Sequence, residues 1–194
     1  MSSSLAEALD RCRAIFEGVP PFGPLLRERF ADRWLRLASL PAGRSRCETV
    51  EDRAELLGRQ NLALLALLGE GSSCLVVTPV LPAESSHRAA QDAERSHLAR
   101  LDGLDGAVLR GWASPEVDVR RPFEVELCLV DFRAGVLDAR LLSAADGRLF
   151  GLVVLGLDQQ CALSPGASTF DVVAPSRIAR DALARRWSAW LPES

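Results

Sequence analysis

The chain has 194 residues and a formal net charge of −3, which suit a single soluble domain and argue against a general nucleic-acid-binding surface. Its 23 basic residues are all arginine, which excludes a lysine Schiff base and a phosphate-binding Walker lysine. No apolar run approaches the ~20 residues of a membrane-spanning helix, and residues 1–16 contain no apolar signal core. We therefore expect a cytoplasmic protein that binds neither membranes nor nucleic acid. The absence of lysine and tyrosine, whose codons are AT-rich, indicates a GC-rich bacterial genome.

Residues 3–40 predict two helices and a strand. Apolar residues recur at helical spacing over 3–17, and the Gly- and Pro-rich stretch 18–24 then ends the helix. A short helix over 25–32 leads into 33–40, where apolar and polar residues alternate as they do in a strand.

The clearest helix of the sequence begins at Thr49 and ends at Gly69. Thr49 and Asp52 have the spacing of a capping box, and a glycine is typical at the end of a helix. The second half of this helix is apolar nearly all round, so we expect it to be buried deeply. The β-branched run 73–81 predicts a central strand whose end is brought to an edge by Pro79.

The composition changes after this strand. Residues 82–106 are polar and rich in alanine and arginine, and they end in the double Asp-Gly turn LDGLDG. We interpret 82–118 as a polar helical insertion on a single globular domain of residues 1–194. It is expected to contain one exposed helix and an irregular return that includes Trp112.

The second half of the chain is rich in strands. Strands are predicted over 122–132, 149–157, 161–163 and 170–174, with helices over 135–145 and from Ser176 onward. Consecutive strands joined by short turns require antiparallel neighbours. The sequence therefore predicts an α+β fold: a mixed, mostly antiparallel sheet of five or six strands with helices packed on it.

Several of these pieces resemble a known group of sequences. The motif Arg-Trp-Leu-Arg-Leu at 33–37, the motif Phe-Asp-Val-Val at 170–173 and the terminal Trp-Leu at 190–191 are similar to those of an uncharacterised bacterial domain family of unknown function. The likeness covers about four-fifths of the chain. Two features depart from the family: the loop 165–169 lacks its aromatic and acidic turn, and the insertion 82–118 is particular to this chain. The resemblance implies the fold and no activity.

The five cysteines are far apart, and no pair has the C-x-x-C spacing. Their odd number and their spacing argue against a zinc ribbon and against a disulfide framework. We expect free thiols that pack as small hydrophobic side chains, at Cys12, Cys47, Cys74, Cys128 and Cys161.

Both histidines lie in the stretch 84–97, each three residues after a glutamate: Glu84 with His87, and Glu94 with His97. On one helix the two histidines would be about 15 Å apart along the axis, too far to share an ion. Each pair alone offers two ligands, whereas a zinc site needs three or four. We therefore expect exposed residues with i,i+3 contacts and predict no metal and no cofactor.

Three aspartates near predicted strand ends form the main candidate for a ligand site: Asp131, Asp158 and Asp171. If they converged they could hold a cation or share a proton, and an arginine such as Arg53 or Arg33 could pair with Asp171. The alternative is that strand ends simply favour turn-forming aspartates.

No catalytic constellation is visible, since neither G-x-S-x-G nor H-E-x-x-H occurs. The leading hypothesis is a non-catalytic bacterial protein-interaction domain, of which an immunity- or antitoxin-like binder of one protein would be a specialised form. Its candidate partner-binding residues are Glu124, Glu126 and Trp112.

The alternative is a small-ligand-binding protein or enzyme that uses a carboxylate cluster with an arginine. A third hypothesis is a homo-oligomer joined through tryptophans, Trp187 and Trp190 among them; core packing of these two is the favoured interpretation.

Overall fold

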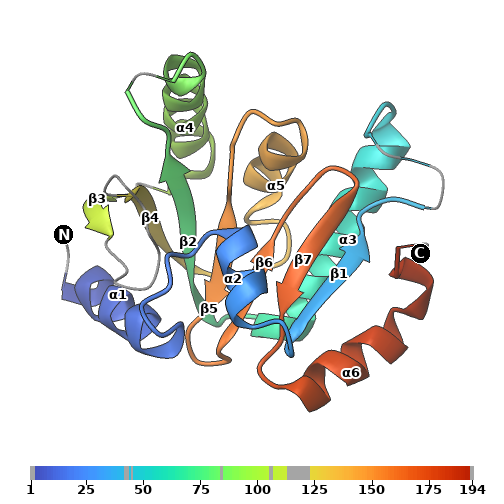
Figure 1. Ribbon diagram of the computed structural model, residues 1–194. Coiled ribbons are helices and arrows are strands. Elements are labelled where there is room, and N and C mark those ends of the chain that lie inside the picture. Colours follow the sequence, from blue (N-terminus) through green and yellow to red (C-terminus); the bar gives the residue numbers. More distant parts are fainter. Residues whose placement is uncertain are drawn as a thin grey trace.

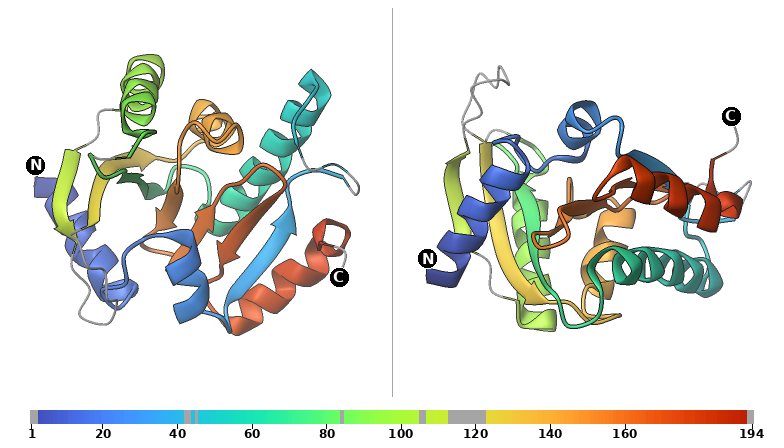
Figure 2. Two further views of the ribbon diagram at one scale, coloured as in Figure 1. Left: turned by 45° about the horizontal axis from the view of Figure 1, so that its top comes forward. Right: turned by 90° about the horizontal axis from the view of Figure 1, so that it is seen from below.

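The computed structural model describes residues 3–41, 44, 46–83, 85–104, 107–112 and 123–192. Helices lie on both sides of one central sheet (Figures 1 and 2). In chain order the elements are α1 (Ser3–Ile15), α2 (Gly23–Arg29), β1 (Trp34–Ala38), α3 (Val50–Leu68), β2 (Ser73–Val80), α4 (Arg88–Asp102), β3 (Ala107–Trp112), β4 (Phe123–Asp131), α5 (Asp138–Ala145), β5 (Val153–Gly156), β6 (Cys161–Ser164), β7 (Thr169–Val173) and α6 (Arg177–Arg186).

Within these ranges the sheet has the strand order β1-β7-β6-β5-β2-β4-β3, and each of its neighbouring pairs is antiparallel. The predicted α+β class is confirmed. Six of the described strands lie outside the insertion, which agrees with the five or six strands that the sequence predicted. The insertion adds β3 at the edge, where an irregular return was expected, because the outer edge of β4 offers backbone groups that need partners.

Two apolar cores lie on the two faces of the sheet. One core joins α1 and α2 to the sheet and includes Leu9, Cys12 and Phe16, as the helical spacing predicted. The other core joins α3, α4 and α5 to the opposite face, where Trp187 also packs. Successive residues of β2 alternate between the two cores, since side chains of a strand point to opposite faces.

The long helix α3 begins as predicted. The Thr49 hydroxyl accepts from the backbone N–H of Asp52, whose carboxylate accepts in return from the backbone N–H of Thr49. The expectation that its second half is buried on all sides is wrong. Leu62 and Leu65 are 50% and 39% exposed, because α3 covers the sheet with one face and has no described element on the other.

Strand β2 lies in the middle of the sheet, and its pairing explains how a proline fits there. It pairs with β4 along its whole length, but with β5 only from Cys74 to Val77. Pro79 therefore lies beyond β5 and has a single neighbouring strand, as expected for a residue that cannot donate a ladder hydrogen bond.

The predicted strand over 149–157 is shorter than expected and begins at Val153. Gly147 and Gly151 both have positive φ, so the chain turns twice before it enters the sheet. At Gly151 a Cβ atom would come within 2.8 Å of the Pro79 ring. The loop between α5 and β5 therefore passes close to the end of β2, below α4.

Candidate functional site

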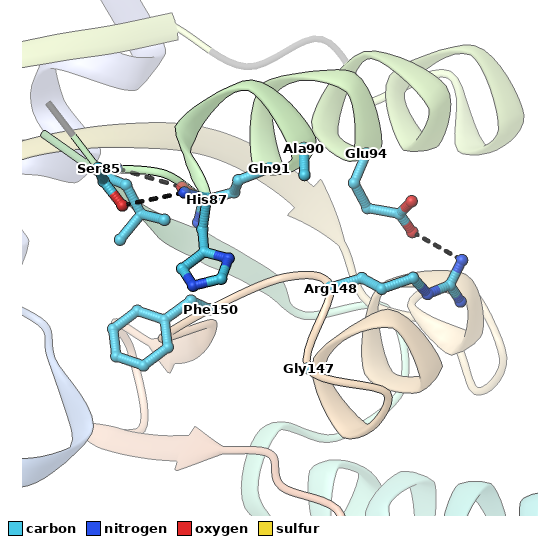
Figure 3. A pocket seen from close by; sticks show the side chains of 9 residues that line it. Ser85, His87, Ala90, Gln91, Glu94, Gly147, Arg148 and Phe150 are labelled. Carbon is cyan, nitrogen blue, oxygen red and sulfur yellow. Dashed lines mark hydrogen bonds and ion pairs between the residues drawn. The ribbon is translucent and has the colours of Figure 1, made fainter. Parts of the chain in front are cut away.

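A pocket of about 610 Å³ lies between the first half of α4 and the loop that joins α5 to β5 (Figure 3). This volume is within the range of roughly 300–1,000 Å³ that small-molecule sites occupy. Most of its wall is apolar, with polar groups at both ends. The lining residues are Leu81, Ser85, His87, Ala90, Gln91, Glu94, Gly147, Arg148 and Phe150.

Gln91 fixes the roof of the pocket to the sheet. Its side chain is buried; the amide nitrogen donates to the carbonyl of Pro79 at 3.1 Å, and the amide oxygen accepts from the backbone N–H of Leu81 at 3.2 Å. Pro79 lies beyond the part of β2 that pairs with β5, and Leu81 follows the last residue of β2, so Gln91 supplies partners where the sheet has none on that side. Gln91 thus fixes the first half of α4 to the end of β2.

An ion pair lies at one end of the pocket (Figure 3). The Arg148 guanidinium lies 3.3 Å from Oε1 of Glu94, and the buried Ser143 hydroxyl donates to the same oxygen at 2.7 Å. Arg148 also donates to Asp146 at 3.0 Å. Within the described part of the chain, Oε2 of Glu94 has no protein donor and Nε of Arg148 has no acceptor. Both atoms therefore keep hydrogen-bonding capacity that no described residue uses.

Two rings lie at the other end of the pocket: His87 at the start of α4, and Phe150 on the α5–β5 loop (Figure 3). Phe150 is 53% exposed, and its ring contacts that of Phe22 with 5.9 Å between centroids. The Ser85 hydroxyl accepts from the backbone N–H of His87 at 3.3 Å. This end offers flat apolar surface with an imidazole and a hydroxyl at its rim.

A buried network of charges anchors the second half of α4. Arg140 of α5 is fully buried and donates to Asp102 at 2.7 Å, while Arg95 of α4 lies 2.9 Å from Glu126 of β4. Burial by itself lowers the pKa of the Arg140 guanidinium, but the hydrogen bond to Asp102 and the neighbouring anions outweigh it and raise that pKa. Arg140 therefore stays charged, and α4 is held to both α5 and the sheet.

The four residues predicted to form a ligand site are not brought together. Asp131 accepts from the Ser73 hydroxyl at 2.8 Å, and Asp158 pairs with Arg11 of α1. Asp171 pairs in a bidentate manner with Arg36, at 2.8 and 3.0 Å, across β1 and β7. The predicted contact between Arg53 and Asp171 does not form. Instead, the Arg53 guanidinium lies 3.4 Å from the Asp146 carboxylate. The predicted pairing failed because the register of β1 against β7 places Arg36 directly opposite Asp171.

The predicted partner-binding residues have different surroundings. Glu126 does not face a partner, because its side chain is buried and turned toward Arg95 and Arg140. Glu124 is half-buried and makes an interaction within the protein. Trp112 is the last residue of β3, and its side chain is outside the described part of the structure.

The two histidines are exposed, and only His87 lines the pocket. Glu84 is outside the described residues. Glu94 contacts Ser143 and Arg148, so the expected i,i+3 contact with His97 does not form. Among the described residues, no group of three or more histidine, cysteine, aspartate or glutamate side chains could hold a metal ion.

The cysteines are free, as predicted, and all except the half-buried Cys47 are buried. Burial raises the pKa of the Cys12, Cys74 and Cys161 thiols to about 12. These three thiols are uncharged near neutral pH and are therefore poor nucleophiles.

Trp187 packs in the core on the α3 side of the sheet, and its ring stacks on Trp190 with 5.2 Å between centroids. The predicted core role of Trp187 is confirmed. Ile178, near the start of α6, is 81% exposed, because α6 packs only through its later residues.

Sequence reasoning missed Gln91, Arg148 and Phe150. A large apolar residue between two glycines, as Phe150 is between Gly147 and Gly151, was an available signal for an exposed turn. The convergence of this turn on α4 had no signal in the sequence, because the pocket residues of α4 and those of the turn are more than fifty residues apart.

Comparisons of the chain with protein-family models, with curated proteins and with solved structures found no match. The resemblance to an uncharacterised bacterial family stays a prediction. In the part of the chain that the structure describes, no helix combines the length and the apolar character needed to cross a membrane.

Proposed function

We propose that this protein binds a small organic molecule in the pocket between α4 and the α5–β5 loop. The observation that carries the proposal is the pocket itself: about 610 Å³ of mainly apolar volume, with an ion pair at one end and two rings at the other. Apolar walls supply most of the binding free energy in such sites, and a few polar groups orient the ligand.

The pocket is supported from several sides, which favours binding without rearrangement. Gln91 ties its roof to the end of β2, Ser143 holds Glu94, and Arg140 holds the far end of α4. A site whose side chains are held in place spends less free energy on ordering when a ligand arrives. No nucleophile or metal ligand set is needed for this function.

A pocket-filling substitution tests the proposal. Ala90 and Ala89 are adjacent exposed residues of α4, but only Ala90 lines the pocket. We expect neutral mono- and bicyclic aromatic fragments to give saturation-transfer NMR signals with the wild-type protein and with Ala89→Trp, and to lose them with Ala90→Trp. If no fragment binds, or if both variants bind fragments equally, the proposal fails.

A second candidate is a protein-interaction domain, for which the exposed side of α3 is the favouring observation. Leu62 and Leu65 lie on one stripe of this helix with the small exposed residues Gly58 and Ala66. Aligned exposed leucines are a common feature of helix faces that dock other proteins.

The second candidate predicts a stoichiometric protein partner from the host, captured by the wild-type protein and lost from the double variant Leu62→Arg/Leu65→Arg. The control is Ile178→Arg, at an even more exposed apolar position on α6. If the wild-type protein, the double variant and the control captured the same partner equally, the exposed side of α3 would not be the binding surface.

A further inference from the structure

We infer that the ligand of this pocket is a neutral planar heterocycle with a cyclic amide edge, an N–H next to a C=O as in a 6-oxopurine. This deepens the proposed function and rests on it. The structural basis is the pairing of one acceptor and one donor at one end of the pocket, Glu94 and Arg148.

The unused atoms of the ion pair match an amide edge. Oε1 of Glu94 pairs with Arg148 and accepts a hydrogen bond from Ser143, whereas its Oε2 has no donor among the described residues. Arg148 has five N–H donors, and the described residues engage its two terminal nitrogens through Glu94 and Asp146. A ligand N–H can therefore donate to Oε2 while the adjacent ligand carbonyl accepts from the guanidinium. Both hydrogen bonds involve a charged group and are stronger than neutral ones.

The rest of the pocket suits a flat ring. Leu81, Ala90 and Phe150 provide apolar wall, and the His87 imidazole lies with Phe150 at the end opposite the ion pair (Figure 3). Aromatic side chains bind flat heterocycles by stacking and edge contacts. A bicyclic ring with its amide edge at Glu94 would extend toward these two rings.

The charge balance favours a neutral ligand over an amino-acid zwitterion. The charges of Glu94 and Arg148 already neutralise each other at 3.3 Å. A zwitterion would bring two further charges into a mainly apolar pocket, and their desolvation costs free energy that a neutral ligand does not lose. An amide edge leaves the ion pair intact and uses only its remaining hydrogen-bonding positions.

The test compares hypoxanthine, which has the amide edge, with 1-methylhypoxanthine, in which the N–H is blocked, and with L-phenylalanine as the zwitterion. Dissociation constants are measured by calorimetry. We expect hypoxanthine to bind about tenfold or more tightly than its methylated form, because the methyl group replaces the N–H that would donate to Oε2 of Glu94.

The variant Glu94→Gln should reduce this preference to less than about threefold, since its amide both accepts and donates. The control Glu28→Gln, at an exposed glutamate of α2 outside the pocket, should keep the preference. Circular dichroism checks that both variants are folded.

Equal binding of the two purines, or tighter binding of L-phenylalanine, would overturn the amide-edge inference. So would the absence of binding by all three probes when aromatic fragments still distinguish Ala90→Trp from Ala89→Trp; in that case the proposed function stands. If those fragments also fail to bind, the proposed function falls together with the inference.

Discussion

Single residues of this protein differ sharply in how their charges are surrounded. Arg140 is fully buried between Asp102 and Glu126, whereas Arg29 pairs with Glu17 at the surface, where both side chains are about half exposed. Removing one partner of a buried pair leaves an uncompensated charge away from water, which costs far more than breaking an exposed pair.

We expect Arg140→Leu to lower the free energy of unfolding by about 3–5 kcal/mol, and Arg29→Leu to change it by less than about 1 kcal/mol. Urea denaturation followed by circular dichroism measures both. Adding Asp102→Leu to Arg140→Leu should recover part of the loss, because the stranded carboxylate is removed. Equal effects of the two single variants would show that Arg140 is not held as described.

At the scale of elements, α3 shows that composition and burial are separate properties. Its second half is almost entirely apolar, yet Leu62 is half exposed whereas Leu64 is 1% exposed. The two leucines lie on opposite sides of the helix, because each residue turns the helix by about 100° and these positions are two residues apart.

This pair of leucines gives a matched prediction on one helix. Leu64→Ala should destabilise the protein by about 2–5 kcal/mol, because it leaves a cavity in the core. Leu62→Ala should cost less than about 1 kcal/mol, because half of Leu62 stays in water in the folded protein, no core cavity forms, and alanine has the higher helix propensity. Thermal and urea unfolding of the two variants measure these changes. A large loss of unfolding free energy for Leu62→Ala would contradict a monomer in which this face of α3 is free.

At the scale of the whole molecule, two cores share one sheet. Phe16 is fully buried on the α1 side, and Trp187 is buried on the opposite side. The strands between them contribute alternate residues to both cores, so neither core can come apart while the other keeps its packing surface. A domain built in this way is expected to unfold in a single cooperative transition.

We therefore expect Phe16→Ala to shift the transitions measured by tryptophan fluorescence and by far-UV circular dichroism together, with a loss of about 3–5 kcal/mol. The wild-type protein should likewise show coincident transitions by the two probes. Two separated transitions in either protein would mean that the layers fold independently.

The sequence by itself determined the local structure of this protein. Capping at Thr49, helical spacing from Leu5 to Phe16 and the late run of short strands were enough for the α+β class and the antiparallel sheet, because they depend on contacts between near neighbours in the chain. Only the tertiary structure decided which distant residues meet. The register of β1 on β7 paired Asp171 with Arg36 instead of Arg53, and the packing of α4 buried Glu126 and brought Glu94 to Arg148. These pairings depend on how whole elements pack, and no spacing within a single segment encodes them.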